Sequence, residues 1–522
     1  MKKRVPSATN KDCSILDHID FEGKNILLVN SRSYLNLPEL EKRGSDAMLV
    51  FIEDVKNKRD SAETNRDTVE TDGNSVETDS KAIEISGNSM ETRGDSKTGV
   101  EDSMGQGFGE MTTCRDSIHY LDTKNQSIDS LGLEKESFDY IVFKNSLETL
   151  YDPWTWLKDV CSYLKLDGKV LVEIANIRNM NVFSSIVNGY FTYSDDGIIS
   201  FDKLRFFTPA ELSVQAVNAG YGIIDVHHSI DASLENRPQV LPGRIYNSQG
   251  DNFVLNNVPG ESLLEMYSDR SLVTLKKQCA DSSFISPLYL QKPADYFENP
   301  RLDLIDMMDG APEAVLEIGC GIGTTCKAIK DRYPSCHTVG IDIDEKSIRK
   351  ASAIIDRAIG ADIEKTGLSE LGIGKETFDY IIYGDVLEHL ENPWEVLRKH
   401  KGYLRRDGKI LASIPNVRHS SVLVSLLYGR WTYAPAGILD VTHLRFFTLR
   451  EIKRSFEAAG FYIYDIKGNP DLKPEDLKLS RDFSHFSFDI QDLRLQNIPR
   501  EEVPEFWIIQ FLVKAGKATG IR

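Results

Sequence analysis

Three glycines at alternate positions, Gly319, Gly321 and Gly323, directly follow the short apolar run of residues 314–318. Glycine has no side chain, so a loop of this kind lets a nucleotide-like ligand lie directly against the backbone. A carboxylate, Asp342, follows about 20 residues further on, at the end of the next apolar run. In nucleotide-binding sheets a carboxylate at this place accepts hydrogen bonds from ribose hydroxyls. The spacing therefore predicts a nucleotide-like ligand site.

Elements that can position such a site surround these residues, because short apolar runs alternate with amphipathic stretches. The runs 314–318, 337–341, 378–383, 409–414 and 507–513 predict strands, and 324–331, 345–355, 393–404 and 449–459 predict helices. Strands that alternate with helices imply a mainly parallel sheet covered on both faces, an α/β fold. Residues 360–363 are expected to follow one of these helices, and Asp362 there either accepts a hydrogen bond from an adenine amine or is a plain loop residue.

The pattern Glu317-x-Gly319-x-Gly321-x-Gly323, with Asp342 and the later stretch 385–390, resembles the class I S-adenosylmethionine-dependent methyltransferases. A dinucleotide-binding dehydrogenase is the competing interpretation, but it expects the spacing Gly-x-Gly-x-x-Gly. The resemblance implies S-adenosylmethionine as cofactor and a Rossmann-like, seven-stranded sheet whose last strand is antiparallel. The cofactor-binding residues expected from it are Glu317, Gly319, Cys320, Gly321, Gly323, Asp342, Ile343, Asp362, Ile363 and Asp385.

Three later stretches, 413–419, 428–433 and 437–448, resemble bacterial methyltransferases of cell-surface polysaccharide biosynthesis. This implies a saccharide or saccharide precursor as methyl acceptor and glycan-assembly enzymes as partners. A quinone-like small molecule or a protein side chain is the alternative acceptor, since a donor site does not define the acceptor. A scaffold in a glycan-assembly complex is the further alternative. Trp431 and Tyr433 either stack on a sugar face or pack in the core.

A sugar hydroxyl loses a proton during methyl transfer, and a histidine with a pKa near neutral is the usual base. The candidate catalytic residues are His389, His419, Asp440 and His443. Each histidine also has a structural interpretation: His389 is expected in a helix after the fourth strand, where it could cap or pack, and His443 could brace Asp440.

The first half of the chain repeats the second at a constant offset of 240 residues, with residues 138–141 matching 378–381 and 204–208 matching 444–448. We therefore predict two tandem domains of the same fold. In the first copy the glycine positions hold Asn30, Arg32 and Tyr34, whose side chains are expected to fill the space of the donor.

Other positions separate into a replaced set and a shared set. In the first copy, the residues aligned with five polar residues of the second copy are different: Asn145 for Asp385, Thr149 for His389, Asn179 for His419, Ser200 for Asp440 and Lys203 for His443. The shared pairs, interpreted as mostly structural, are Glu148 and Glu388, Asn176 and Asn416, Arg178 and Arg418, Tyr193 and Tyr433, and Arg205 and Arg445. The first copy is thus predicted to be a degenerate domain that pairs with the second as an intramolecular pseudo-dimer.

Composition places further bounds on the chain. The predicted domains are 1–280, with a disordered insert at 56–115, and 281–522. The formal net charge of −18 argues against nucleic acid as a partner. The sequence contains no run of about 18 apolar residues, so membrane insertion is not predicted and we expect a cytoplasmic protein. The seven cysteines are never spaced Cys-x-x-Cys, which indicates reduced thiols and predicts no metal site.

Overall fold

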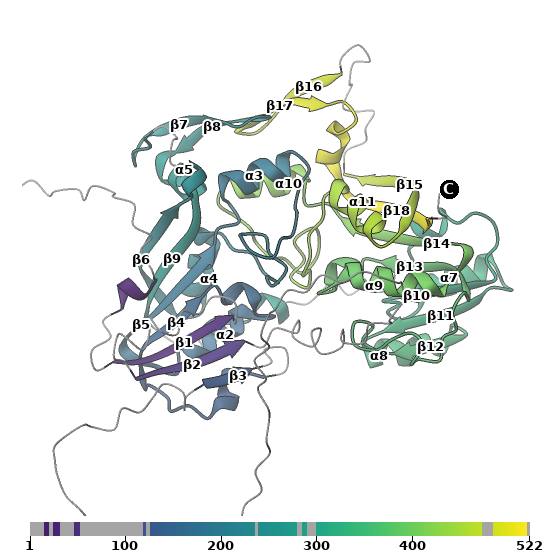
Figure 1. The fold of residues 1–522 in the computed structure, drawn as a ribbon, viewed down its shortest axis with the longest axis horizontal. Helices are drawn as coiled ribbons and strands as arrows, with labels where there is room; N and C mark the ends of the chain where they lie inside the picture. Colours follow the sequence, from purple (N-terminus) through teal and green to yellow (C-terminus); the bar gives the residue numbers. More distant parts are fainter. Residues whose placement is uncertain are drawn as a thin grey trace, which may run out of the picture.

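The computed structural model describes residues 15–19, 24–31, 46–52, 118–121, 126–234, 239–278, 284–289, 299–471 and 484–518 of the chain. These residues form two seven-stranded sheets and one four-stranded sheet, with helices around them (Figure 1). The predicted insert at 56–115, the residues Arg32 and Tyr34 and the side chain of Asn30 lie outside the described part.

The sheet of the C-terminal half has the strand order β12-β11-β10-β13-β14-β18-β15. Its strands are β10 (Ala314–Ile318), β11 (His337–Asp342), β12 (Arg357–Gly360), β13 (Phe378–Gly384), β14 (Leu404–Pro415), β15 (Phe461–Pro470) and β18 (Ile508–Lys517). Strands β10 to β14 pair in parallel, whereas β18 runs antiparallel between β14 and β15. All five predicted strands are present in this sheet.

One prediction about the edge of this sheet is wrong. Gly360 is the last residue of β12 and does not follow a helix, because helix α8 (Glu345–Ala351) ends four residues before the predicted 355. The chain then turns, and the backbone N–H of Thr338 donates to the carboxylate of Asp356 at 2.8 Å. This contact ties the turn to β11 and lets the following residues start the edge strand.

Successive side chains of the central strands point to opposite faces of the sheet, as the strand geometry requires. Leu316 of β10 belongs to a core cluster with Phe456 of helix α11. Its neighbour Val315 belongs to a different cluster, with Leu304 of helix α6 and Ile329 of helix α7. Both faces are therefore covered by helices, which explains why these strands read as continuous apolar runs.

The sheet of the N-terminal half has the order β3-β2-β1-β4-β5-β9-β6, the same arrangement strand by strand. Its strands are β1 (Asn25–Ser31), β2 (Asp46–Ile52), β3 (Ile118–Leu121), β4 (Phe138–Lys144), β5 (Leu164–Ala175), β6 (Tyr221–Ile230) and β9 (Ser268–Lys277). The registers agree as well, since Tyr140 pairs with Lys169 as Tyr380 pairs with Lys409.

Ten α-helices lie in the described residues. They are α2 (Pro153–Val160), α3 (Met180–Val187), α4 (Pro209–Asn218), α5 (Gly260–Met266), α6 (Leu302–Ile305), α7 (Thr324–Arg332), α8 (Glu345–Ala351), α9 (Pro393–His400), α10 (Ser420–Leu427) and α11 (Leu449–Ala458). Side chains cap two of these helices: Asp152 accepts from the N–H of Thr155 at 3.0 Å, and Asn392 accepts from the N–H of Glu395 at 3.2 Å.

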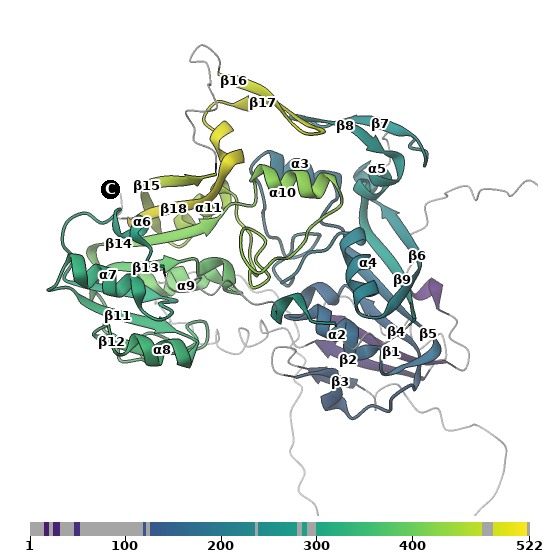
Figure 2. The same cartoon turned by 180° about the vertical axis from the view of Figure 1, so that it is seen from behind.

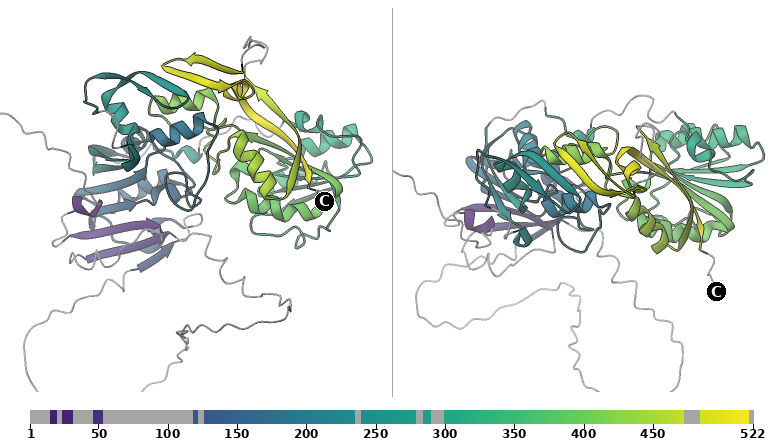
Figure 3. Two further views of the ribbon diagram at one scale, coloured as in Figure 1. Left: turned by 45° about the horizontal axis from the view of Figure 1, so that its top comes forward. Right: turned by 90° about the horizontal axis from the view of Figure 1, so that it is seen from above.

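A four-stranded sheet joins the two halves, with the order β16-β17-β8-β7. Its strands are β7 (Ile245–Gln249), β8 (Phe253–Pro259), β16 (His485–Ile490) and β17 (Leu493–Pro499). β17 pairs antiparallel with β8, Leu493 opposite Leu255 and Leu495 opposite Phe253. Figures 2 and 3 show this sheet running from one half to the other, with α3 and α10 side by side beneath it.

The contacts between the halves come in reciprocal pairs related by the offset of 240 residues. Arg205 donates to the carbonyl of His443 at 2.9 Å, and Arg445 donates to that of Lys203 at 2.6 Å. The N–H of Phe206 donates to the hydroxyl of Tyr433, and the N–H of Phe446 donates to that of Tyr193, both at 3.0 Å. Thr208 donates to the carbonyl of Gly429 at 2.6 Å, and Thr448 donates to that of Gly189 at 2.7 Å. Such mutual use of one patch is the geometry of a two-fold symmetric interface.

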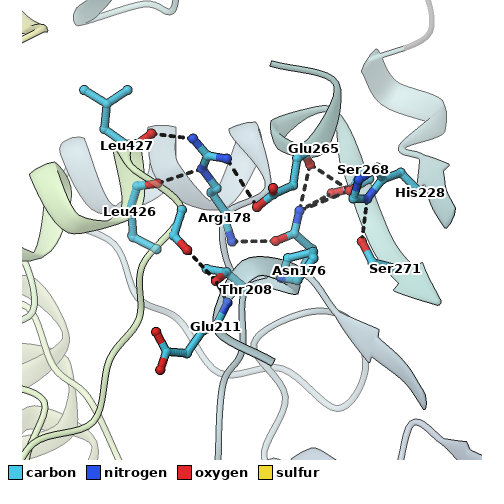
Figure 4. A network of polar contacts seen from close by, with 12 residues as sticks. Asn176, Arg178, Thr208, Glu211, His228, Glu265, Ser268, Ser271, Leu426 and Leu427 are labelled. Carbon is cyan, nitrogen blue, oxygen red and sulfur yellow. Dashed lines mark hydrogen bonds and ion pairs between the residues drawn. The ribbon is translucent and has the colours of Figure 1, made fainter. Parts of the chain in front are cut away.

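Two buried arginines lie at the centre of this interface. Figure 4 shows Arg178, which donates to the carbonyl of Leu426 at 2.8 Å and to that of Leu427, and pairs with Glu265 at 3.2 Å. Its counterpart Arg418 donates to a carbonyl of α3 and pairs with Glu505 at 2.8 Å. Both arginines are 2% exposed, so each guanidinium exchanges water for carbonyl and carboxylate acceptors of the protein.

One apolar core cluster contains side chains from both halves, among them Phe183 and Leu255 from the first and Leu423 and Phe506 from the second. Among the described residues, the predicted boundary at 280 therefore does not separate two independent cores. None of the described helices is long and apolar enough to cross a membrane.

Candidate functional site

The glycine loop connects β10 to α7, and all three glycines have positive φ angles, +69° at Gly319, +52° at Gly321 and +85° at Gly323. Residues with side chains rarely adopt this conformation. A Cβ atom at Gly319 would lie 2.5 Å from Cγ2 of Val386, whereas one at Gly321 would have no neighbouring heavy atom within 4 Å. The loop therefore leaves open space at Gly321 where a ligand can approach the backbone.

Asp342 lies directly beside this open space, at the end of β11. Its carboxylate accepts hydrogen bonds from the N–H of Gly321 and from the N–H of Asp344, both at 2.8 Å. The next side chain, Ile343, is 72% exposed. A carboxylate thus stands next to the glycine loop, where the motif spacing predicts one, and the exposed Ile343 follows it in the chain.

Asp362 and Ile363 follow the neighbouring edge strand and come directly after Ala361, whose N–H donates to the carbonyl of Asp342 at 3.0 Å. The Asp362 carboxylate accepts from the N–H of Glu364 at 3.0 Å and pairs with Lys365 at 3.1 Å. Ile363 is buried in the core of the sheet. Asp362 therefore stabilises the turn that it belongs to, next to the predicted site, and Ile363 anchors this turn in the core of the sheet.

Glu317 lies beneath the loop and fixes its connection to α7. Its carboxylate accepts from the N–H of Cys326 at 3.2 Å, and burial raises the pKa of Glu317 to about 7. Cys320 is also buried, and a Cβ on Gly340 would lie 2.6 Å from its sulfur atom. Both residues hold the loop from inside the protein, so their side chains position the site rather than line its open space.

Asp385 stands at the end of β13 with a positive φ of +54° and takes part in a polar network. Its carboxylate pairs with Arg301, accepts from the hydroxyl of Ser413 at 3.0 Å and accepts from the amide of Gln510. Sequence reasoning did not identify Arg301 or Gln510, because neither belongs to a motif and each comes near Asp385 only through the sheet order. The network fixes Asp385 at the carboxyl end of the sheet.

Glu388, His389 and His443 form one group in which a ligand atom from each side chain lies within 4.8 Å of the others. His389 ends a short 3-10 helix, Leu387–His389, which follows β13, where the sequence predicts a helix. The Nδ1 atom of His389 contacts the carbonyl of Thr442 at 3.1 Å, and that of His443 contacts the carbonyl of Ile438 at 3.0 Å. The structure thus brings together two of the three candidate histidines, with Glu388, which was not among the candidates.

Glu388 is 1% exposed, and burial together with the nearby Asp385 carboxylate raises its pKa well above the usual value. Sequence reasoning placed it among the shared structural residues because Glu148 occupies the same position in the first half. Identity of residue type at two aligned positions gave no signal that their surroundings differ.

The other two predicted catalytic residues have local structural contacts. His419 caps α10 by accepting from the N–H of Ser421 at 3.2 Å and lies 3.1 Å from Asp471. Asp440 is buried and accepts from the N–H of Thr442 at 2.8 Å, which shapes the segment before His443. His419 lies outside the group formed by Glu388 and the other two histidines.

The suggested sugar platform is wrong. Trp431 is fully buried in the core cluster shared by the two halves, and Tyr433 is 7% exposed, with its hydroxyl accepting from Phe206. Both rings pack against the first half, so the core interpretation holds because their faces are covered by side chains of the protein itself.

Comparison with known proteins identifies the same region. Residues 294–466 match a family described as a methyltransferase domain. The ubiquinone biosynthesis O-methyltransferase of Aeromonas salmonicida (strain A449) is 26% identical over 183 residues, covering 34% of this chain and 75% of the relative. That of Neisseria meningitidis serogroup C (strain 053442) is 27% identical over 177 residues, covering 33% and 73%.

Two further matches carry S-adenosylmethionine in their names. A probable S-adenosylmethionine-dependent methyltransferase of Mycolicibacterium smegmatis is 29% identical over 156 residues, covering 30% of this chain and 54% of the relative. The structure of an S-adenosylmethionine-dependent methyltransferase from Mesorhizobium loti is 16% identical, covers 41% of this chain and 95% of its own, and has a TM-score of 0.28.

The local geometry fits this donor. Open space at Gly321, a carboxylate at Asp342 and the exposed side chain of Ile343 suit a ligand that carries a ribose and an adenine ring. The matched range contains all three residues and the group around Glu388. The C-terminal half of this chain is accordingly an S-adenosylmethionine-dependent methyltransferase domain with S-adenosylmethionine as its cofactor.

Proposed function

We propose that the chain transfers a methyl group to a hydroxyl oxygen of a saccharide or saccharide precursor of a bacterial cell-surface glycan, at a single site in its C-terminal half. The observation that carries this proposal is that one short segment, residues 386–389, reaches both the glycine loop and the candidate histidines. Val386 lies against Gly319 of the donor loop, and His389, three residues on, stands beside His443 with ring centroids 4.8 Å apart. A donor held by the loop and a hydroxyl held by the histidines meet along this segment.

The donor side is built for binding and orientation. The sulfonium of S-adenosylmethionine supplies an already activated methyl group. Asp342 accepts hydrogen bonds from the ribose hydroxyls, Ile343 packs on the adenine ring, and Gly321 leaves the room that both need. Correct orientation of two reactants lowers a barrier by roughly 7–11 kcal/mol, so positioning is the main task of these residues.

The acceptor side must remove a proton from the hydroxyl. In both His389 and His443 the Nδ1 atom contacts a backbone carbonyl. Nε2 is then the ring nitrogen that can accept the proton of the acceptor hydroxyl. A base placed in this way contributes roughly 10²–10⁴ in rate. Asp440 supports the arrangement by shaping the segment that carries His443.

A second candidate acceptor is a phenolic hydroxyl of a quinone-related small molecule. It is favoured by the similarity to ubiquinone biosynthesis O-methyltransferases, of which this chain covers about three quarters in one case. A phenol, with a pKa near 10, loses its proton more readily than a sugar hydroxyl, so the same histidines suffice.

For the first half, residues 1–280, we propose a degenerate tandem copy that acts as a structural partner of the active half. Arg205 of the first half donates to the carbonyl of His443 at 2.9 Å and so holds the segment of a proposed catalytic residue. The reciprocal contacts support a pseudo-dimer. If residues from about 285 onward, expressed alone, were as stable and active as the full chain, this role would be excluded.

Calorimetric titration of S-adenosylmethionine into the full chain tests the single site. We expect one site per chain, lost in a Gly321→Arg variant, which places in the loop the residue type found at the aligned position 32. Gly310→Arg is the matched control, because Gly310 also has a positive φ, +80°, and open space at its Cβ. Two sites would contradict a degenerate first half, and no site would remove the enzyme function.

Isotope-labelled S-adenosylmethionine then distinguishes the acceptors. The chain is incubated separately with nucleotide-activated sugars and with polyphenols, and the products are analysed by mass spectrometry. O-methylated sugars support the first candidate. Methylation confined to phenols supports the second and contradicts the first.

A further inference from the structure

The buried carboxylate of Glu388 lacks any hydrogen-bond partner at either oxygen. A carboxylate out of contact with water costs several kcal/mol unless a cation or hydrogen-bond donors replace the water. At 1% exposure water cannot provide that replacement, so the ionised form needs it from the protein or from a bound cation. The aligned residue in the first half shows how the same fold provides it.

Glu148, the counterpart of Glu388, has a hydrogen-bond donor at one oxygen and a cation in its surroundings. Its Oε1 atom accepts from the backbone N–H of Ala175 at 2.7 Å. The ammonium of Lys203 is buried nearby, where its charge favours the ionised form of Glu148, and it donates to the carbonyls of Gly197 at 2.5 Å and Ile198 at 3.2 Å. The first half therefore offsets part of the cost of burying its glutamate with a fixed cation and a backbone donor, although burial still raises the pKa of Glu148.

The second half has lost both partners. Pro415 stands in place of Ala175 and has no N–H to donate, and His443 stands in place of Lys203. The carbonyl of Ile438, counterpart of that of Ile198, is retained and contacts Nδ1 of His443 at 3.0 Å. At the same time His389 replaces Thr149. Compared with Glu148, Glu388 therefore has two imidazoles near it and lacks both the fixed cation and the backbone donor.

We propose that Glu388, His389 and His443 bind a divalent transition-metal ion, such as Zn²⁺, Mn²⁺, Fe²⁺ or Co²⁺. Two imidazoles and one carboxylate are a donor set that such ions favour. The carbonyls of Thr442 and Ile438 orient the two rings through Nδ1, which is the usual outer support of a metal-binding histidine. This proposal departs from the expectation of no metal site, which rested on cysteine spacing alone.

The ligand atoms lie within 4.8 Å of one another. Metal–ligand distances of about 2.0–2.2 Å place neighbouring ligand atoms roughly 3–3.5 Å apart, so the three side chains close by about 1 Å on an ion. Both rings and the carboxylate can make this movement by rotation about side-chain bonds. The ion supplies the positive charge that Lys203 supplies in the first half.

The role of the ion in catalysis rests on the proposed function. A hydroxyl oxygen of the acceptor that binds the ion loses its proton to solvent more readily, because the metal lowers the pKa of the hydroxyl. The oxygen lone pair then forms the bond to the methyl carbon as the carbon–sulfur bond breaks, and S-adenosylhomocysteine leaves. In this arrangement His389 and His443 are ligands rather than bases.

Metal binding is measured directly, without donor or acceptor. The full chain is stripped with a chelator, titrated with Co²⁺ under visible absorption spectroscopy, and dialysed against Zn²⁺ for elemental analysis. We expect one ion per chain and visible bands from imidazole coordination. His443→Lys, which copies the first half, should remove the ion and weaken affinity at least 100-fold, and Glu388→Gln should weaken it at least 10-fold.

Lys203→Met is the matched control in the first half, and its stoichiometry should remain one. Circular dichroism and S-adenosylmethionine binding confirm that each variant is folded. No saturable Co²⁺ binding, or equal binding in wild type and folded His443→Lys, would overturn the proposal and leave Glu388 as a protonated acid. Because the readout is metal content, a failed search for the methyl acceptor does not affect it.

Discussion

The buried pair of Tyr383 and His400 offers a quantitative test of how a polar contact inside the C-terminal sheet controls stability. The hydroxyl of Tyr383 and Nδ1 of His400 lie 2.7 Å apart in the core. The first half carries Phe143 and Val160 at the same two positions. The double change Tyr383→Phe with His400→Val therefore copies a combination that the fold already accommodates.

At pH 7.5 each single change leaves one partner without its hydrogen bond, and a buried unsatisfied group costs about 1–3 kcal/mol. The double variant removes both groups together, so we expect it to recover most of that loss. The coupling between the two changes should thus be about 1–2 kcal/mol in favour of the double variant.

The pH dependence follows from the histidine. Burial, with smaller effects from Lys399 and Lys375, lowers the pKa of His400 to about 4 from 6.5. A lowered histidine pKa gives stability that is complete above pH 6.5 and is lost as the pH falls toward 4. Linkage with these two pKa values gives a loss of about 2 kcal/mol between pH 7.5 and pH 5, which approaches about 3 kcal/mol below pH 4.

Urea unfolding of the wild type, both single variants and the double variant at pH 7.5 and pH 5 measures both effects. Hydrogen exchange of peptides from β13 and α9 reports on the sheet itself, because a chain of this size can unfold in more than one step. Other titrating groups are common to all four proteins and cancel in the differences. An equal loss of stability at pH 5 in wild type and double variant would refute the reasoning.

Three further changes test other parts of the structure. Asp342→Ala should weaken S-adenosylmethionine binding at least about tenfold in calorimetry, since it removes the proposed ribose acceptor and the contact to the loop; unchanged affinity would place the donor elsewhere. Arg418→Leu should lower the free energy of unfolding in urea by about 3–5 kcal/mol, because Glu505 is left buried without its partner, and the Arg418→Leu, Glu505→Leu double change should restore most of it. The pKa of Glu317 is raised to about 7, so wild type loses folding stability as the pH rises from 4.5 to 7. Glu317→Gln lacks this titration, and its free energy of unfolding should gain about 3 kcal/mol relative to wild type over that range. Parallel curves of stability against pH for the two proteins would contradict this reasoning.

The sequence was most informative where one local pattern determines the structure. The apolar runs of β10, β11 and β13 are buried on both sides, so their composition alone predicts strands. The glycine loop was predictable because positive φ angles at three alternate positions demand that residue type. Asp342 was predictable because the end of one parallel strand lies beside the end of the next.

Features that depend on distant pairing could not be predicted. The strand β8 meets β17 from the other half, and neither strand carries a sign of its partner. Arg301 and Gln510 reach Asp385 only through the sheet order. Glu388 was missed for another reason: its aligned partner Glu148 is the same residue, and the difference lies in Pro415 and His443, which replace Ala175 and Lys203 near the glutamate only in the folded chain.

The sheet shared by the two halves sets the order of events during synthesis. β8 ends at residue 259, but its partner β17 begins only at residue 493. At roughly 5–20 residues per second, on the order of 10–50 seconds of translation separate them. During this interval the first half has made the residues of its core yet lacks Leu423 and Phe506, which complete that core. The N-terminal half therefore cannot finish folding first, and its exposed apolar surface is available to chaperones until the last part of the chain emerges.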